Sequence, residues 1–194
     1  MSASHGGVPK GASVITLIAV ILFFIAYVFH AQISGIIHLP IATTTQNTIG
    51  IYYDVTKITD GDTIHLSMDG RDETVRLIGI NTPETVDPRR AVECFGKEAS
   101  ERMKEIAKGK IVRLEYDDSQ SVRDTYGRLL AYVYLEDGQM INRKMIAEGY
   151  AYEYTYLTPY KYQKEFRELQ VLAKTGGRGL WASTTCNGNV KTSQ

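Results

Sequence analysis

The sequence predicts an α+β domain, a small closed β-barrel of five strands with three helices, preceded by one N-terminal transmembrane helix. Two features indicate the barrel domain: after Ile51, apolar and polar residues alternate in short runs, and stretches with helical apolar spacing separate or follow these runs. A third feature indicates the transmembrane helix, because no Asp, Glu, Lys or Arg occurs between Lys10 and Asp54. The 194 residues allow one domain of ordinary size plus such an appendage.

The apolar segment 12–32 is the predicted membrane anchor. Ala12 to Phe29 is nearly all apolar, and a helix needs about 20 such residues to cross the hydrocarbon core. The alternative is a cleaved signal peptide, whose apolar run usually has only ~7–15 residues and ends in small residues. Tyr27 to His30 are bulky, which favours an uncleaved anchor.

The charges beside the anchor predict its orientation. Lys10 and the amino terminus flank it, and by the positive-inside rule they keep residues 1–11 in the cytoplasm. We therefore expect a single-pass protein of the cell membrane whose main domain is extracytoplasmic. Residues 33–49 contain a Pro and a run of Thr, and we expect them to be a linker with no function beyond reach.

Cys94 and Cys186 are the two cysteines of the chain. They cannot form a structural zinc site, because no His residues accompany them at suitable spacing. In an extracytoplasmic domain an even number of cysteines suggests one disulfide, and two buried free thiols are the alternative. A bridge between them would close a loop of about 90 residues, for which the chain-entropy model gives roughly 4–5 kcal/mol.

The formal charge is balanced, with 22 basic and 22 acidic residues. The charge of the whole protein therefore provides no general attraction for nucleic acid. If nucleic acid binds, the attraction must come from locally placed Arg and Lys side chains or from a metal ion.

Five runs of residues have the alternation and the β-rich composition of strands, and the turn "MDGRDE" joins the second run to the third as a hairpin. The runs are 51–60, 62–69, 73–80, 110–118 and 128–138. This order of strands, with a helix between the third and the fourth, is that of a small closed barrel of the oligonucleotide-binding (OB) type.

Helical spacing identifies the three helices. The first is expected over 96–109, the second over 138–150, and the third from Thr158–Pro159, an N-cap followed by Pro, to Gly176–Gly177. Their predicted buried residues are Ala99, Met103, Ile106 and Ala107; Met140, Ile141, Met145 and Ile146; and Tyr162, Phe166, Leu169 and Ala173. Trp181 is expected to pack back on the core, so the domain covers 50–184 and 185–194 form a C-terminal tail.

Two short motifs place polar side chains near strand ends. In "TDGDT", Asp60 and Asp62 stand two residues apart and point to the same side of a chain that enters a strand. In "VRLIGINTPE", Arg76 lies on a strand, while Asn81 and Glu84 follow its end. Taken alone, the first motif is also compatible with an ordinary Asp-Gly turn, and the second with an Arg on a solvated face.

A third motif, "RDTYGRLLAY", contains a turn from Asp124 to Gly127, and Arg128 opens the fifth strand. Together the three motifs resemble the thermonuclease, or staphylococcal nuclease, family, over a region from about Val55 to Trp181 that also includes "GKEAS" and "GLW". The resemblance implies a five-stranded barrel with three helices. It also implies calcium-dependent hydrolysis of the phosphodiesters of DNA and RNA.

The resemblance also implies a set of metal ligands. Asp62 matches a direct calcium ligand, and Thr82 matches a residue that offers its backbone carbonyl. Asn81 falls where the family has a second carboxylate ligand, and Asp60 corresponds to a carboxylate just outside the direct ligands. An Asn oxygen is an acceptable calcium ligand but lacks a full charge, so we expect weaker calcium binding than with Asp.

The catalytic groups follow in the same way. Glu84 matches the proposed general base, which points or deprotonates the attacking water. Arg76 and Arg128 match two arginines that grip the scissile phosphate and stabilise its extra charge in the transition state. Tyr126 is similar to a tyrosine near the nucleotide phosphate. Because Glu84 and both arginines are present, we expect an active site.

Tyrosines are abundant in "GYAYEYTYLTPYKY", where the family has residues that stack on the nucleotide. We select Tyr154 and Tyr156 for this role, and the alternative is a mixture of core and surface tyrosines. Stacking needs unpaired bases, so it would favour single-stranded or frayed substrate.

Two functions are compatible with these residues. The first is a monomeric, membrane-anchored, calcium-dependent nuclease acting on DNA, RNA or both. The second is a non-catalytic OB-type barrel that binds single-stranded nucleic acid or a protein partner, and Asn81 is the residue that favours it.

Overall fold

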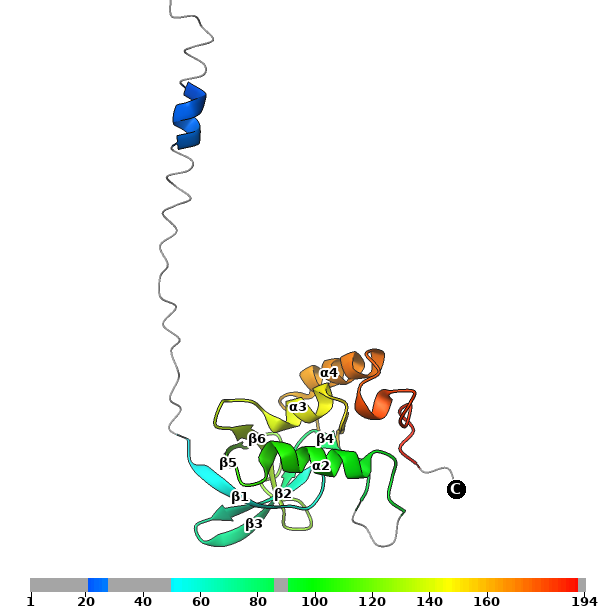
Figure 1. Cartoon of the computed structure of the whole chain (residues 1–194). Helices are drawn as coiled ribbons and strands as arrows, with labels where there is room; N and C mark the ends of the chain where they lie inside the picture. Colours follow the sequence, from blue (N-terminus) through cyan, green and yellow to red (C-terminus); the bar gives the residue numbers. More distant parts are fainter. Residues whose placement is uncertain (1–20, 28–49, 86–90, 192–194) are drawn as a thin grey trace, which may run out of the picture. The chain divides into compact units, whose positions relative to one another are not determined.

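The computed structural model describes residues 21–27, 50–85 and 91–191 (Figure 1). The chain divides into two units, 1–48 and 49–194. In the first unit, residues 21–27 are helical and exposed, and no helix among the described residues has the length and apolar character that crossing a membrane requires. The predicted anchor, 12–32, extends past this helix on both sides. Its remainder, the segment 1–11 and the predicted linker up to residue 49 lie outside the described residues.

The second unit contains the predicted five-stranded closed barrel, which is thereby confirmed. Its strands are β1 (Tyr52–Ile58), β2 (Thr63–Met68), β3 (Arg71–Leu77), β5 (Ile111–Glu115) and β6 (Leu129–Leu135). They close in the order β1-β2-β3-β6-β5. Neighbouring strands are antiparallel except β3 and β6, which are parallel.

The β2–β3 hairpin shows why these runs form strands. Ile64, Leu66 and Val75 are buried on the inner face, and the polar residues between them face outward or stay half-buried. The connection is the two-residue turn Asp69–Gly70, with φ of 50° and 75°. Positive φ at both positions is what a type I′ hairpin turn requires, and Gly meets this requirement without steric strain.

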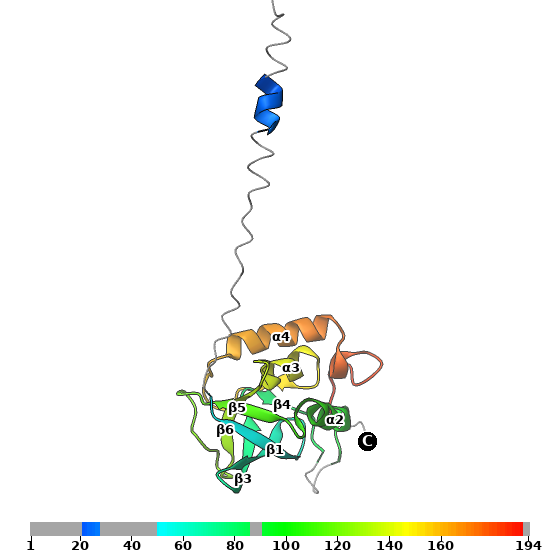
Figure 2. The same cartoon turned by 60° about the vertical axis from the view of Figure 1, so that its left-hand side comes forward.

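Three helices cover the barrel: α2 (Gly96–Ala107), α3 (Ile141–Ala147) and α4 (Gln163–Thr175). The predicted inner face of α2 is buried, as are the four residues predicted for the second helix. In both views α3 lies between α4 and the barrel, while α2 packs beside β1 (Figure 1 and Figure 2).

The predicted start of the third helix is wrong, because α4 begins at Gln163 and not near Thr158. Thr158 and Pro159 instead bind the loop after β5. The Gln120 side-chain amide donates to Thr158 Oγ1 at 3.0 Å and to the Pro159 carbonyl at 3.1 Å. These tertiary hydrogen bonds take the place of a helix cap, which the local sequence alone cannot reveal.

A two-stranded sheet of β4 (Ile80–Asn81) and β7 (Tyr152–Glu153) lies beside the barrel. Gly79 precedes it with φ +77°, and a Cβ there would lie 2.5 Å from the Tyr160 ring. The buried Asn142 of α3 accepts a hydrogen bond from the Val133 N–H and donates to the Ile78 carbonyl, both at 2.9 Å. α3 and β6 thereby hold the backbone just before β4.

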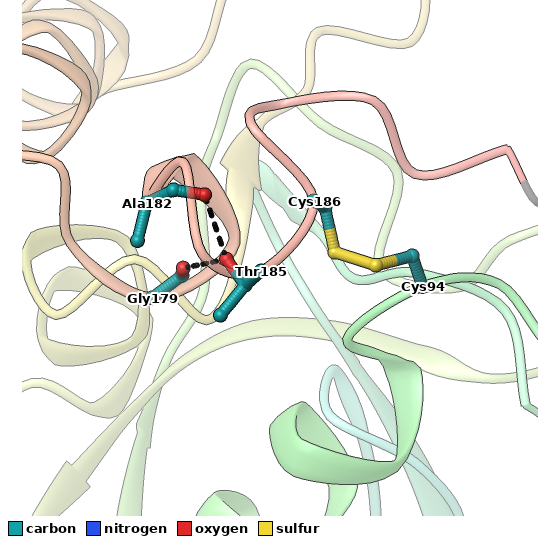
Figure 3. Close-up of a disulfide and its surroundings, with 5 residues drawn as sticks. All are labelled: Cys94, Gly179, Ala182, Thr185 and Cys186. Atoms are coloured by element: carbon teal, nitrogen blue, oxygen red, sulfur yellow. Dashed lines mark hydrogen bonds between the residues drawn. A yellow bond between two sulfur atoms is a disulfide. The ribbon is translucent and has the colours of Figure 1, made fainter.

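The C-terminal segment packs on the domain. Cys94 and Cys186 form a disulfide with Cα atoms 6.0 Å apart, which joins the segment before α2 to the segment after the 3₁₀ helix η1 (Gly179–Trp181) (Figure 3). Within η1, Leu180 is fully buried and Trp181 is half-buried beneath the Lys174 ammonium. Residues 185–190, expected as part of a tail, are therefore attached to the domain, and 192–194 lie outside the described residues.

Candidate active site

One open cleft of about 820 Å³ lies across the β3–β4 connection and the loops before β6 and after β7. All the residues that the sequence predicts for metal binding, catalysis and substrate binding line it. They are Asp60, Asp62, Arg76, Asn81, Thr82, Glu84, Tyr126, Arg128, Tyr154 and Tyr156. The tertiary structure thus brings together residues that lie almost 100 positions apart in the sequence.

Asp62 is the most deeply placed of these groups, with 5% of its surface exposed. Its Oδ2 atom accepts hydrogen bonds from the Thr82 N–H at 2.8 Å and the Thr82 hydroxyl at 3.1 Å, and it lies 3.1 Å from Arg76 Nη2. The Thr63 hydroxyl donates to Oδ1 at 3.0 Å. A buried carboxylate with these donors has a fixed orientation, as a metal ligand must have.

Asp60 lies two residues before Asp62, in the turn between β1 and β2. Its side chain accepts a hydrogen bond from the Asp62 N–H at 3.0 Å, so the two carboxylates are tied to one another through the backbone. Burial, and next the negative charge of Asp62, raise the pKa of Asp60 well above its usual value. A cation bound beside Asp60 would stabilise its ionised form.

Arg76 is fixed at several atoms. Nη1 donates to the carbonyls of Leu77 at 3.1 Å and Ile80 at 2.9 Å, and Nη2 donates to Asn81 Oδ1 at 2.7 Å. With 13% of its side chain exposed, the guanidinium lies at the floor of the cleft. It is therefore oriented before any phosphate arrives.

Asn81 stands between two partners. Because Arg76 can only donate, the Asn81 oxygen faces it, and the Asn81 amide nitrogen donates to the Tyr152 hydroxyl. The oxygen that the sequence assigns to calcium thus already accepts one hydrogen bond. A carbonyl oxygen has two lone pairs, so a second position on it is available to a cation.

Glu84 lies in the loop that follows β4. Its N–H donates to Glu93 Oε2 at 3.0 Å, its carbonyl accepts from the Glu93 N–H at 2.8 Å, and its Oε1 accepts from the Thr85 N–H at 2.9 Å. The two hydrogen bonds to Glu93 join the backbone at Glu84 to the segment that enters α2.

Arg128 lies directly before β6 and also lines the cleft. Its Nε and Nη2 atoms both lie 2.7 Å from Asp124 Oδ2, and the Asp124 Oδ1 accepts from the backbone N–H groups of Tyr126 and Arg128. The predicted turn from Asp124 to Gly127 is present, with Gly127 at φ +81°. The Tyr126 ring, 84% exposed, lies 5.4 Å from the guanidinium carbon.

Tyr154 and Tyr156 form the aromatic part of the cleft. They are 42% and 71% exposed, and their ring centroids lie 6.4 Å apart. The Tyr154 N–H donates to the Gly79 carbonyl, which fixes this segment to the β3–β4 connection. Exposed, neighbouring rings in the same cleft as two arginines are suited to stacking of unpaired bases.

The groups near Asp62 that could bind a cation all offer oxygen atoms. They are two carboxylates, the Asn81 amide and nearby backbone carbonyls. Calcium prefers such oxygen donors and completes its coordination with water, so the residues present fit this ion. Within the described part of the chain, no group of three or more His, Cys, Asp or Glu side chains could hold a metal. A cation here would therefore depend on backbone, amide and water oxygens as well as on carboxylates.

The sequence patterns assign no role in the site to several further cleft residues, among them Glu93, Arg123, Asp124 and Tyr152. Asp124 is recognisable as a turn residue, but its grip on Arg128 depends on side-chain direction. Tyr152 belongs to the tyrosine-rich stretch, and only the pairing of β4 with β7 shows that it meets Asn81. Arg123 donates to Glu73 Oε2 at 2.8 Å across the rim, a contact between residues 50 positions apart.

Comparison with known proteins gives concordant matches. The family model described as staphylococcal nuclease homologue matches residues 74–183. The chain is 41% identical to Thermonuclease of Staphylococcus hyicus over 131 residues, which cover 68% of this chain and 76% of that protein. It is 41% identical to Thermonuclease of Staphylococcus intermedius over 142 residues, 73% of this chain and 83% of that protein. Endonuclease YncB of Bacillus subtilis (strain 168) is 39% identical over 126 residues, 64% of this chain and 59% of that protein.

The names of these relatives identify them as nucleases. We therefore reject the alternative function, a non-catalytic barrel that only binds nucleic acid or a protein. The matched region contains the closed barrel's last strands, all three helices and most of the cleft. From the barrel, the cleft and the matches we conclude that the chain belongs to the staphylococcal nuclease family and is a nuclease that hydrolyses phosphodiester bonds.

Proposed function

We propose that the protein is a calcium-dependent nuclease that cleaves DNA, RNA or both, with single-stranded or frayed substrate preferred. One observation carries this proposal: two arginines, two aspartates and a glutamate from distant segments line a single cleft together with exposed tyrosines. The anionic substrate would be attracted by these local groups, because the balanced total charge supplies no general attraction.

In this mechanism Arg76 and Arg128, which line the same cleft, bind the scissile phosphate. Asp62, Asn81 and two backbone carbonyls hold Arg76, and Asp124 holds Arg128, so both guanidiniums are oriented before the phosphate binds. As the nucleophile adds, negative charge grows on the non-bridging oxygens, and fixed donors stabilise that charge more than the ground state. Glu84 orients the attacking water and accepts its proton.

We propose that calcium is held by Asp62, the Asn81 oxygen and the Thr82 backbone carbonyl, with Asp60 just outside these ligands. When bound, the ion supplies polarisation of the phosphate and a site for the water. Asp62 is suited to this role because Thr82 and Thr63 fix both of its oxygens.

The aromatic groups would bind the nucleotide. Tyr154 and Tyr156 offer ring faces to unpaired bases, and Tyr126 lies beside Arg128, near the phosphate position. Monomeric action is expected, because one chain supplies all these groups.

We further propose that residues 12–32 anchor the protein in the cell membrane and that the nuclease domain is extracytoplasmic. The uncharged sequence of that segment supports the anchor, and the disulfide supports an oxidising compartment. Fractionation of cells should place the chain in the membrane pellet, and protease added to intact cells should remove the domain. A soluble chain with a new N-terminus would instead indicate a cleaved signal peptide.

The first experiment incubates the purified full-length chain with denatured DNA in calcium or in chelator, beside the Glu84→Gln variant. We expect cleavage only with calcium, and a turnover number about 10²–10⁴-fold lower in the variant. Cleavage that persists in chelator would contradict calcium dependence, and unchanged turnover in the variant would contradict the role of Glu84. Comparing denatured with duplex DNA tests the preference for unpaired bases.

A further inference from the structure

The disulfide lies next to the segment that holds the proposed general base. Cys94 directly follows Glu93, whose side chain and N–H hold the backbone of Glu84 at 3.0 and 2.8 Å. The Cys94 N–H also donates to the Val190 carbonyl at 2.9 Å. One covalent bond and one hydrogen bond thus attach the C-terminal segment to the entrance of α2.

The start of α2 touches the Glu84 loop with no room between them. A Cβ on Gly96 would lie 2.6 Å from the Thr85 side chain and 3.0 Å from the carbonyl oxygens of both Pro83 and Glu84. Because the backbones meet this closely, a shift of the segment 93–96 must move Glu84 as well.

The residues after the two half-cystines are strained. In the described part of the chain three residues other than glycine have positive φ, and two of them are Phe95 at 68° and Asn187 at 48°. Each directly follows a cysteine of the bridge. Such backbone persists only where the surroundings enforce it, so opening the bridge would let both segments relax.

We propose that Glu93 is a positioning residue for Glu84, and that the Cys94–Cys186 disulfide fixes Glu93, so that oxidised enzyme turns over faster than reduced enzyme. This inference rests on the proposed role of Glu84 as general base. The arginines and tyrosines of the cleft come from β3, the loop before β6 and the segment around β7, and none of them belongs to the segment 93–96. Substrate affinity is therefore expected to stay unchanged while turnover falls.

The redox step has a simple balance. A dithiol reductant gives two electrons and two protons to the bridge and becomes a cyclic disulfide. The S–S bond breaks, and Cys94 and Cys186 each carry a thiol. Reoxidation reverses the change, so the loss of turnover should be reversible.

The experiment measures kcat and KM of the full-length chain on denatured DNA with saturating calcium, before and after treatment with dithiothreitol. We expect kcat to fall about tenfold on reduction and KM to change by less than about twofold, since small displacements of a catalytic group lower turnover strongly. The Cys94→Ser/Cys186→Ser variant should match the reduced enzyme and should not respond to the reductant.

Three further variants separate positioning from general loosening. Thr185→Val removes the hydrogen bonds from Thr185 Oγ1 to the Gly179 and Ala182 carbonyls, one residue from Cys186 (Figure 3). It perturbs the same segment without touching the route to Glu84, so its kcat should equal that of the wild type. Glu93→Ala keeps the disulfide but removes the acceptor for the Glu84 N–H, and its kcat should fall about tenfold. Glu93→Gln keeps an acceptor oxygen and should recover most of that loss.

The outcomes are distinct. Equal kcat in oxidised and reduced enzyme, or full turnover in Glu93→Ala, would overturn the positioning proposal. If the double variant fails to fold, Glu93→Ala with an intact bridge still decides the question. Glu84→Gln measured in parallel identifies the source of a failure: if it turns over like the wild type, the proposed function of Glu84 has failed and this inference fails with it.

Discussion

Arg76 has nearly all of its polar contacts inside the protein. Two backbone carbonyls, Asn81 and Asp62 surround its terminal nitrogens at 2.7 to 3.1 Å. A guanidinium that is already oriented loses little side-chain entropy when a phosphate binds, whereas a free arginine would have to be ordered first. At the scale of single residues, the site is therefore prepared by neighbours that do not themselves react.

Asn81→Asp should strengthen calcium binding. The variant adds a second negative charge among the proposed ligands and keeps an oxygen for Arg76 Nη2, so half-saturation should occur at about 3- to 10-fold lower calcium. Calcium titration of nuclease activity, supported by calorimetry of binding, measures the shift. Calcium dependence identical to that of the wild type would show that residue 81 is not a ligand.

Arg128→Lys should lower kcat/KM about 10²-fold, because lysine keeps the charge but loses the planar fork that binds two phosphate oxygens. Arg123→Lys is the matched comparison, since Arg123 also lines the cleft and also pairs with a carboxylate, Glu73. Its effect should not exceed about threefold, as expected for an exposed pair. Steady-state kinetics of the two variants decide between them, and equal losses would refute the assignment of Arg128.

At the scale of elements, turns and short strands set where the catalytic loops begin. Gly79 joins β3 to β4, and its carbonyl accepts from the Tyr154 N–H and the Tyr160 hydroxyl. Asp117, in the loop after β5, accepts from the Tyr132 hydroxyl at 2.6 Å and the Lys161 N–H at 2.8 Å. These two points connect the barrel to the aromatic wall of the cleft.

Gly79→Ala should destabilise the fold by about 2–4 kcal/mol, because positive φ and the nearby Tyr160 ring both oppose a Cβ. Gly70→Ala is the matched variant, with φ +75° and no atom within 4 Å of the added Cβ. At Gly70 only the backbone strain of the positive φ opposes the substitution, so the free energy of unfolding should fall by about 1 kcal/mol. Urea unfolding of both variants measures the difference, and equal destabilisation would show that the close packing at Gly79 is not decisive.

The ionised Asp117 side chain should contribute to the free energy of unfolding, and this contribution should be lost in acid. Burial opposes its ionisation, but hydrogen bonds from the Lys161 N–H, Tyr132 and Ser119 outweigh it and hold the pKa of Asp117 below its usual 3.8. Its folded pKa is thus the depressed one, so its contribution is present above the unfolded pKa and is lost as pH falls through the folded pKa. Asp117→Asn should cost about 1–3 kcal/mol at neutral pH, and this deficit should shrink below about pH 4.

Denaturant unfolding of both proteins across that pH range provides the measurement for Asp117. Tyr132→Phe is a useful companion, since it removes one of the donors but leaves the carboxylate. A deficit in Asp117→Asn that stays constant down to the lowest pH would contradict the proposed linkage.

At the scale of the whole molecule, the bridge constrains a long loop. Cys94 and Cys186 are 92 residues apart, and the chain between them includes all three helices and the last two barrel strands. Opening the bridge should lower the free energy of unfolding by roughly 4–5 kcal/mol in the chain-entropy model, mainly by freeing the unfolded chain. Urea unfolding of oxidised enzyme and of Cys94→Ser/Cys186→Ser gives this value, and a difference near zero would mean that native contacts alone hold the segment.

The sequence predicts the barrel well because its strands and its hairpin turn are local patterns. Alternation in 62–69 and 73–80 requires one face of each run to be buried, and Asp69–Gly70 admits a tight turn. The start of α4 is mispredicted for the opposite reason. Thr158–Pro159 has the residue types of a helix N-cap. However, the Thr158 hydroxyl accepts a hydrogen bond from the side chain of Gln120, 38 residues away, and does not cap a helix.

By itself, the sequence determines the order of the strands, the residue types of the site and the family resemblance, since each depends on neighbours within a few positions. Only the tertiary structure decides that Tyr152 meets Asn81 and that the bridge reaches Glu84 through Glu93. These are contacts between side chains whose directions follow from strand pairing and packing. Because such contacts form when distant segments are buried together, no local pattern encodes them.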